Sequence, residues 1–191
     1  MAFQNVNELL LDGGVFIFEV ARFSTIVTQG YFDTIYHEHM SYYTVSGCLS
    51  LASSTGFKIE KVEEINTHGG SFRFYLRKTI EVIPSDEVLA ICNFEETSGF
   101  TSSNIFASCE KNIEEKKKQI HDILSGIPDN LLVGYGAPAK LVTLAYQVEL
   151  DQFPIRYIID DNELKQGKFI PGLGYEILSL NSVNRIVSDS A

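Results

Sequence analysis

The sequence predicts a mixed α/β protein, and three patterns carry this prediction. Residues 15–20 and 155–159 are short runs rich in Val, Ile, Phe and Tyr, which are typical of β-strands. Residues 105–124 repeat apolar side chains at helical spacing and predict a long helix. Residues 134–139, the glycine loop, have the pattern G-x-G-x-x-A, which is informative where a strand precedes it and a helix follows.

That context is present around the glycine loop. A short buried strand is expected at residues 131–133 and a helix at 140–150, and the strand at 155–159 ends at Asp160. In such loops the first glycine allows a tight turn and the second lets the backbone approach a phosphate. An acid about twenty residues further on accepts ribose hydroxyls. The sequence therefore predicts a Rossmann-like C-terminal domain, and a module of this kind that binds nothing is the open alternative.

The remaining elements are expected to surround a small sheet. The first helix is marked by an apolar stripe of Phe3, Val6, Leu9 and Leu10. The others are a strand at 15–20, a helix at 46–54 ending near Gly56, strands near 57–66 and 71–79, and a helical connector from Pro84. Residues 114–118 are expected to be the solvated face of the long helix, with His121 beside them on the surface.

The composition excludes several classes of protein. The chain has 191 residues, 45% of them hydrophobic, which suits one large domain or two small ones. Its net charge of −10 argues against a nucleic-acid partner, because no basic face stands out. No apolar run is long enough to span a membrane, and the N-terminus lacks a signal-peptide pattern. Three cysteines without pairing logic favour a reducing, cytoplasmic setting.

Residues 32–39, the histidine motif, are the densest group of titratable side chains. The motif contains Tyr36, His37, Glu38 and His39, and His68, Gly69, Gly70 and Ser71 follow downstream. Three interpretations stay open: general acid–base chemistry, a metal site formed by the three histidines, and histidines that pair with Glu38 and backbone carbonyls. The two adjacent glycines allow close approach to a ligand, and they also suit a turn between two strands.

Together these motifs resemble the C-terminal half of S-adenosylmethionine-dependent C-methyltransferases that act on nucleotide-linked keto-deoxysugars. The resemblance rests on Tyr36-x-Glu38-His39, the His68-Gly69-Gly70-Ser71 stretch, the glycine loop with Lys140, Asp160-x-Asn162 and Lys165-Gln166-Gly167. It implies that His39 is the catalytic base, with Tyr36 and Glu38 as its catalytic partners. The substrate-binding residues that it implies are His37, His68, Gly69, Gly70, Ser71, Gly134, Gly136, Ala137, Lys140, Asp160 and Lys165.

The resemblance also implies an organisation and a set of ligands. Residues 1–83 would be the end of a methyl-donor domain carrying the histidine motif and a small β insertion, 84–128 a helical connector, and 129–191 a truncated Rossmann-like domain. The family's zinc-binding domain carries cysteines, and its methyl-donor domain opens with a glycine-rich loop. Neither a C-x-x-C pair nor such a loop precedes the histidine motif here, so we expect a fragment that is inactive alone. The S-adenosylmethionine site would lie mostly outside the chain, no metal is expected, and an oligomer is left open. The rivals are a non-catalytic nucleotide-binding module and a histidine-ligated metal-dependent hydrolase.

Overall fold

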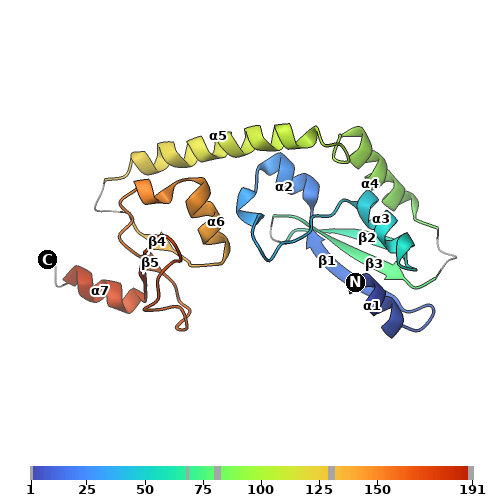
Figure 1. The fold of residues 1–191 in the computed structure, drawn as a ribbon, viewed down its shortest axis with the longest axis horizontal. Helices are drawn as coiled ribbons and strands as arrows, with labels where there is room; N and C mark the ends of the chain where they lie inside the picture. The colour runs from blue at the N-terminus through green and yellow to red at the C-terminus, as the bar shows by residue number, and fades with distance from the viewer. Residues whose placement is uncertain (1, 68, 80–82, 129–131, 189–191) are drawn as a thin grey trace. The chain divides into compact units, whose positions relative to one another are not determined.

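The computed structural model describes residues 2–67, 69–79, 83–128 and 132–188, which form two compact units (Figure 1). Unit 1 comprises Met1–Tyr31 and His39–Asn112, and unit 2 comprises Phe32–Glu38 and Ile113–Ala191. Among the described residues, every helix is too short or too polar to cross a membrane.

Unit 1 contains an antiparallel sheet of three strands. The strands are β1 (Val15–Ala21), β2 (Lys58–Ile65) and β3 (Ser71–Arg77), in the order β1-β3-β2. Phe74 of the central strand lies opposite Phe18 on one side and Val62 on the other. Apolar side chains alternate along the strands, so one face of the sheet is buried. The predicted strands are confirmed to within a few residues at their ends.

Helices cover the buried face of this sheet (Figure 1). They are α1 (Ala2–Leu9), α3 (Val45–Ser54) and α4 (Asp86–Thr97). Helix α2 (Phe23–Gln29) follows β1. The core includes Val45 and Cys48 of α3 and Val88 of α4, packed on the sheet residues Ile59 and Phe74.

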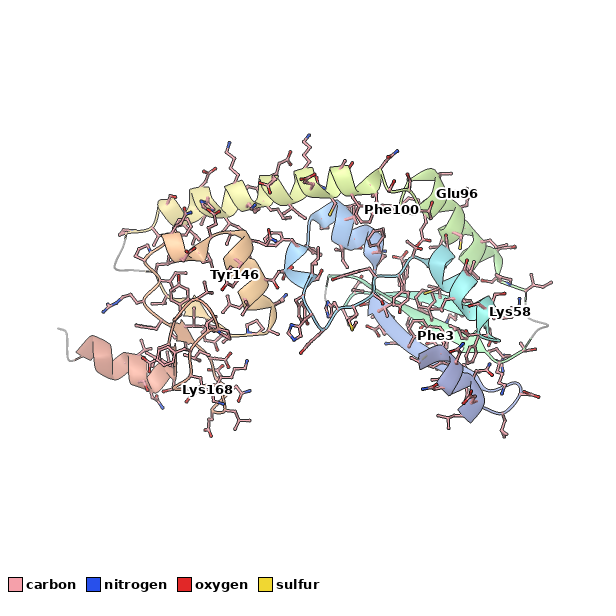
Figure 2. The ribbon with its side chains drawn as sticks, viewed as in Figure 1. Phe3, Lys58, Glu96, Phe100, Tyr146 and Lys168 are labelled. Atoms are coloured by element: carbon pink, nitrogen blue, oxygen red, sulfur yellow. The ribbon has the colours of Figure 1, made fainter. Side chains whose placement is uncertain are left out.

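Helix α1 adds its own apolar stripe to the core of unit 1. Phe3, labelled in Figure 2, makes edge-on ring contacts with Phe16 at 5.5 Å and Phe18 at 5.3 Å. The prediction was wrong for Leu9, which is 84% exposed, whereas Leu10 packs against the core. At about 100° per residue, Leu9 lies about 120° from Phe3 around the axis of α1, at the edge of the apolar face.

Unit 2 contains a parallel sheet of three short strands. They are β4 (Gly134–Tyr135), β5 (Ile158–Ile159) and β6 (Ile177–Leu178), in the order β4-β5-β6. Helix α6 (Lys140–Gln147) and the turn η2 (Leu150–Gln152) connect β4 to β5, and α7 (Leu180–Ser188) follows β6. Helix α5 (Ile105–Ser125) enters unit 2 at Ile113. A parallel strand–loop–helix–strand order is the Rossmann-like arrangement, so the predicted mixed α/β class is confirmed.

Three predicted elements of unit 2 begin or end elsewhere. The strand expected at 131–133 is shifted to β4, because only the pairing of Gly134 and Tyr135 with β5 is regular. Residue 131 lies outside the described residues, and Val133 is 42% exposed rather than buried. The helix expected to reach residue 150 ends at Gln147, because Glu149 has a left-handed backbone with φ of 52°. The strand expected at 155–159 keeps only its last two residues.

One other side chain was assigned differently from the sequence. His121 was expected on the surface, but it is half-buried, with Nε2 2.7 Å from the Val148 carbonyl oxygen and its ring against Phe153. Val88 of the expected connector is only 1% exposed and belongs to the core of unit 1. The compact units therefore divide residues 84–128 between them, and they separate Phe32–Glu38 from its neighbours in sequence.

Candidate functional site in unit 2

Most of the histidine motif folds with unit 2. Phe32 starts the short η1 helix (Phe32–Thr34), is 6% exposed and packs against Ala145, Val148 and Leu150. Asp33 Oδ2 lies 2.7 Å from Lys140 Nζ at the start of α6. Burying a Phe side chain is worth about 1.5–3 kcal/mol, whereas a partly exposed ion pair is worth about 0–1 kcal/mol. Phe32 is thus the main anchor, and the ion pair fixes the direction of the segment.

The glycine loop connects β4 to α6 in a conformation that needs its glycines. A Cβ at Gly134 would overlap the side chain of Ile158 on the neighbouring strand, so this glycine permits close strand packing. Gly136 has φ of 90°, which side chains disfavour, and its amide donates to the Ile159 carbonyl at 2.6 Å. The loop therefore has a single shape that is held to β5 on one side.

Asp160, the first residue after β5, fixes the loop from behind. Its Oδ2 accepts a hydrogen bond from the Ala137 amide at 2.6 Å, and its Oδ1 accepts one from the Asn162 amide at 2.8 Å. The hydrogen bond from Ala137 is the largest cause that lowers the pKa of Asp160, followed by the bond from Asn162 and the Lys165 ammonium. Lys165 Nζ donates to Oδ2 at 3.1 Å and to the Ala137 carbonyl at 2.9 Å.

A cavity of about 590 Å³ opens in front of the glycine loop, and we call it the lysine pocket. Tyr36 and His37 of the histidine motif line it together with residues 137–139 of the loop. Lys165 and Lys168 also line it, and Lys168 is labelled in Figure 2. Apolar lining comes from Val142, Leu164, Phe169, Ile170 and Pro171. The described lining residues include no aspartate and no glutamate, although the chain carries a net charge of −10.

The structure therefore brings together several predicted site residues within unit 2. Tyr36, His37, Ala137 and Lys165 line the lysine pocket, while Asp160 supports the loop behind it. Gly134 and Gly136 shape that loop, and Lys140 pairs with Asp33 beneath the histidine motif. Cations and an aromatic hydroxyl around an apolar wall suit a ligand that has both an anionic group and rings.

Other predicted residues lie in unit 1. Gly69 and Gly70 form the turn between β2 and β3 with φ of 86° and 121°, and the Gly70 carbonyl accepts from the Arg22 amide at 3.0 Å. Ser71 is 4% exposed, and its hydroxyl donates to the Thr67 carbonyl at 3.3 Å. The interpretation of this stretch as a strand turn is confirmed. His68 lies outside the described residues.

His39 and Glu38 fall at the boundary between the two units. His39 is exposed and belongs to unit 1, and Glu38 ends the unit 2 segment. Glu38 Oε1 lies 4.0 Å from Nε2 of His37, and both side chains are largely exposed. Among the described residues, no three His, Cys, Asp or Glu side chains are placed to hold a metal ion.

Two residues at the site have roles that the sequence reasoning missed. Lys168 faces the lysine pocket, and the signal was its position three residues after Lys165 in the same loop. Asp33 belongs to the histidine motif but had no role assigned, and no local pattern links it to Lys140.

A parallel strand, a glycine loop and a helix beside a lysine-bearing pocket are typical of nucleotide-binding α/β proteins. Residues 66–190 match the family described as the C-methyltransferase C-terminal domain. The chain is also 30% identical over 172 residues to C-methyltransferase NovU of Streptomyces niveus. This alignment covers 87% of the chain and 40% of that protein. The chain belongs to the C-methyltransferase family, as its motifs predicted, and it spans less than half the length of this relative.

Proposed function

We propose that this chain is the substrate-binding part of a C-methyltransferase and that the lysine pocket holds a nucleotide-linked keto-deoxysugar. One observation carries the proposal: the pocket joins the histidine motif to the glycine loop, and its described lining contains two lysines and no carboxylate. The lysines suit the diphosphate, and the apolar wall suits the flat faces of a base and a sugar. Tyr36 and His37 then lie at the end of the pocket where the reacting sugar would be placed.

The proposed chemistry is removal of a proton from the carbon beside the sugar carbonyl. His39 would accept that proton, and the electron pair of the C–H bond would move onto the carbonyl oxygen as an enolate. Tyr36 would donate a hydrogen bond to that oxygen, and Glu38 would orient the imidazole and stabilise its charged form. His39 follows His37 by two residues, so their Cα atoms are at most about 7 Å apart.

The methyl donor of this family is S-adenosylmethionine, which supplies a methyl group activated by a positively charged sulfur. A glycine loop between a parallel strand and a helix occurs in the described residues only at 134–139, and that loop borders the pocket assigned to the substrate. The sheet of unit 1 is antiparallel throughout and has no such loop. The residues present do not fit the donor. We propose that the donor is held mostly by segments that correspond to the unmatched part of the longer relative. We also propose that the chain alone does not methylate.

Calorimetry on the purified chain tests the ligand class. Thymidine diphosphate should bind, and thymidine and NAD should bind at least tenfold more weakly. Lys168→Gln should weaken the diphosphate by about tenfold, the usual worth of one charge-assisted hydrogen bond of about 1.5 kcal/mol, and should change thymidine little. Lys118→Gln on the exposed face of α5 is the control, because it removes the same charge. Absence of diphosphate binding, or equal losses in the two variants, contradicts the proposal.

The base is tested in a complete C-methyltransferase that carries this chain. His39→Asn should lower turnover by about two to four orders of magnitude, because Asn cannot accept the proton at working pH. His37→Asn should lower it much less. Exchange of the sugar C–H with deuterated solvent isolates the proton step from methyl transfer. Unchanged exchange in His39→Asn, or a larger loss in His37→Asn, would reverse the two roles.

A further inference from the structure

Three amides of the glycine loop, those of Gly134, Gly136 and Ala137, are already used within the protein. The Gly134 amide donates to the Tyr157 carbonyl at 3.1 Å, and the Gly136 amide donates to the Ile159 carbonyl at 2.6 Å. The Ala137 amide donates to Asp160 Oδ2 at 2.6 Å, and Pro138 has no N–H. A loop that cradles a phosphate directs such amides toward the ligand. Here a carboxylate of the protein occupies the place of the anion.

The acceptor positions of the Asp160 carboxylate are also largely occupied by donors of the protein. The residue is 8% exposed, and a carboxylate offers about four acceptor positions. Three donors share them: the Ala137 amide, the Asn162 amide and Lys165 Nζ. The Asp160 carbonyl also accepts from Gln166 Nε2 at 3.0 Å, which fixes the backbone that carries the carboxylate. About one acceptor position is left for a pentose hydroxyl, on a residue that is only 8% exposed.

Lys165 is the outward end of the same network. Its ammonium has three N–H groups, and two of them donate to Asp160 Oδ2 and to the Ala137 carbonyl. One acceptor lies on the glycine loop and the other directly after β5, and together they hold the ammonium at the edge of the lysine pocket. Lys168 also lines the pocket, and no ion pair with it is found among the described residues.

We propose that Asp160 is a positioning residue, which closes the glycine loop and orients Lys165, and that it does not accept the pentose hydroxyl of the nucleotide. The diphosphate is then bound by the side chains of Lys165 and Lys168 rather than by the amides of Gly134, Gly136 and Ala137. The part of this inference that concerns the ligand rests on the proposed function. The closure of the loop by Asp160 is independent of any ligand.

A thermodynamic cycle tests the ligand part. Thymidine diphosphate and its 3′-deoxy analogue are titrated into the parent chain and into Asp160→Asn by calorimetry. Asp160→Asn should weaken both ligands by the same factor, within about twofold, because the variant disturbs the loop and Lys165 but no contact to the hydroxyl. A loss that is at least tenfold larger for the ligand with the hydroxyl would show a direct contact and overturn the inference.

Backbone NMR tests the closure of the loop without ligand. The Ala137 amide proton should shift as the pH is lowered, with a midpoint below the ordinary pKa of an aspartate, because its acceptor becomes protonated. Asp160→Asn should abolish this titration, and Asp161→Asn, which changes the exposed neighbouring acid, should retain it. If the pH titration of the Ala137 amide proton is the same in Asp160→Asn as in the parent chain, the positioning role of Asp160 is overturned. If no nucleotide binds, the proposed function fails, and this measurement still decides the role of Asp160.

Discussion

Glu95 of α4 connects to the start of α3 and offers a direct test of how unit 1 is stabilised. Its carboxylate is only 3% exposed, and Oε1 accepts from the Val45 amide at 2.7 Å. Its Oε2 accepts from the Ser46 amide at 2.9 Å and from the Ser46 hydroxyl at 2.8 Å. The first amides of a helix have no partner inside the helix, so this distant carboxylate acts as a cap.

The change Glu95→Gln replaces one of these oxygens by a nitrogen that cannot accept a hydrogen bond. At least one bond to a charged acceptor is lost, which costs about 1.5–3 kcal/mol. Removal of a negative charge from a helix N-terminus costs about 0.3–1 kcal/mol more, and up to ~2 kcal/mol when partly buried. The free energy of unfolding of unit 1 should therefore fall by about 3 kcal/mol.

Urea unfolding followed through the amide resonances of β2 and β3 reports on unit 1 alone. With an m-value of about 1–3 kcal/mol per molar urea, the midpoint should move by about 1–3 M. Glu96→Gln is the control, because Glu96 is the exposed neighbour on the same helix and is labelled in Figure 2. This control should stay within about 0.5 kcal/mol of the parent. A similar loss in both variants would refute the capping argument.

Three further predictions concern single residues. Glu149→Gly should raise the free energy of unfolding of unit 2 by about 0.5–1 kcal/mol in urea, since φ of 52° suits glycine; a less stable variant contradicts this. Burial raises the pKa of the Cys48 thiol to about 12, so iodoacetamide should modify it only in denaturant; mass spectrometry that finds it alkylated in the folded chain rejects the prediction. The pKa of Asp160 is lowered in the folded chain, so its contribution to stability is complete above the ordinary value of about 3.9 and is lost as pH falls through the lowered value. Asp160→Asn should remove this acid-dependent part from unfolding curves, and an unchanged pH profile speaks against it.

Local periodicity predicted most of the secondary structure. The alternation in residues 15–20 and 71–79 gave β1 and β3, and the helical spacing from Ile105 gave α5, which ends at Ser125. These signals are local, because the apolar periodicity that marks the buried face of a helix or strand repeats within one or two turns or pleats of the sequence. The strands β4 and β5 are shorter than the apolar runs in the sequence predicted. Apolar character predicts that residues are buried, but it does not predict how many of them pair with a neighbouring strand.

The candidate site was predicted only in part, for a reason that differs from residue to residue. The motifs singled out Tyr36, His37 and Lys165 as site residues, and the structure brings these three to one pocket. The sequence does not show whether the Asp160 carboxylate accepts from a ligand hydroxyl or from an amide of the protein, and in the structure it accepts from the Ala137 amide. Outside the site, the capping role of Glu95 in unit 1 depends on a contact fifty residues away, for which no spacing rule exists.

The burial of Phe32 has a consequence for how this protein can be divided and recombined. The chain passes between its two units three times, after Tyr31, Glu38 and Asn112. A gene segment that encodes residues 113–191 alone would lack Phe32, and the cluster formed by Ala145 and Val148 would lose one of its buried members. Exchange of this region between related enzymes therefore has to include the seven residues Phe32–Glu38, or to match them to the new partner. Residues 32–38 and the buried cluster of Ala145 and Val148 are in this way inherited together.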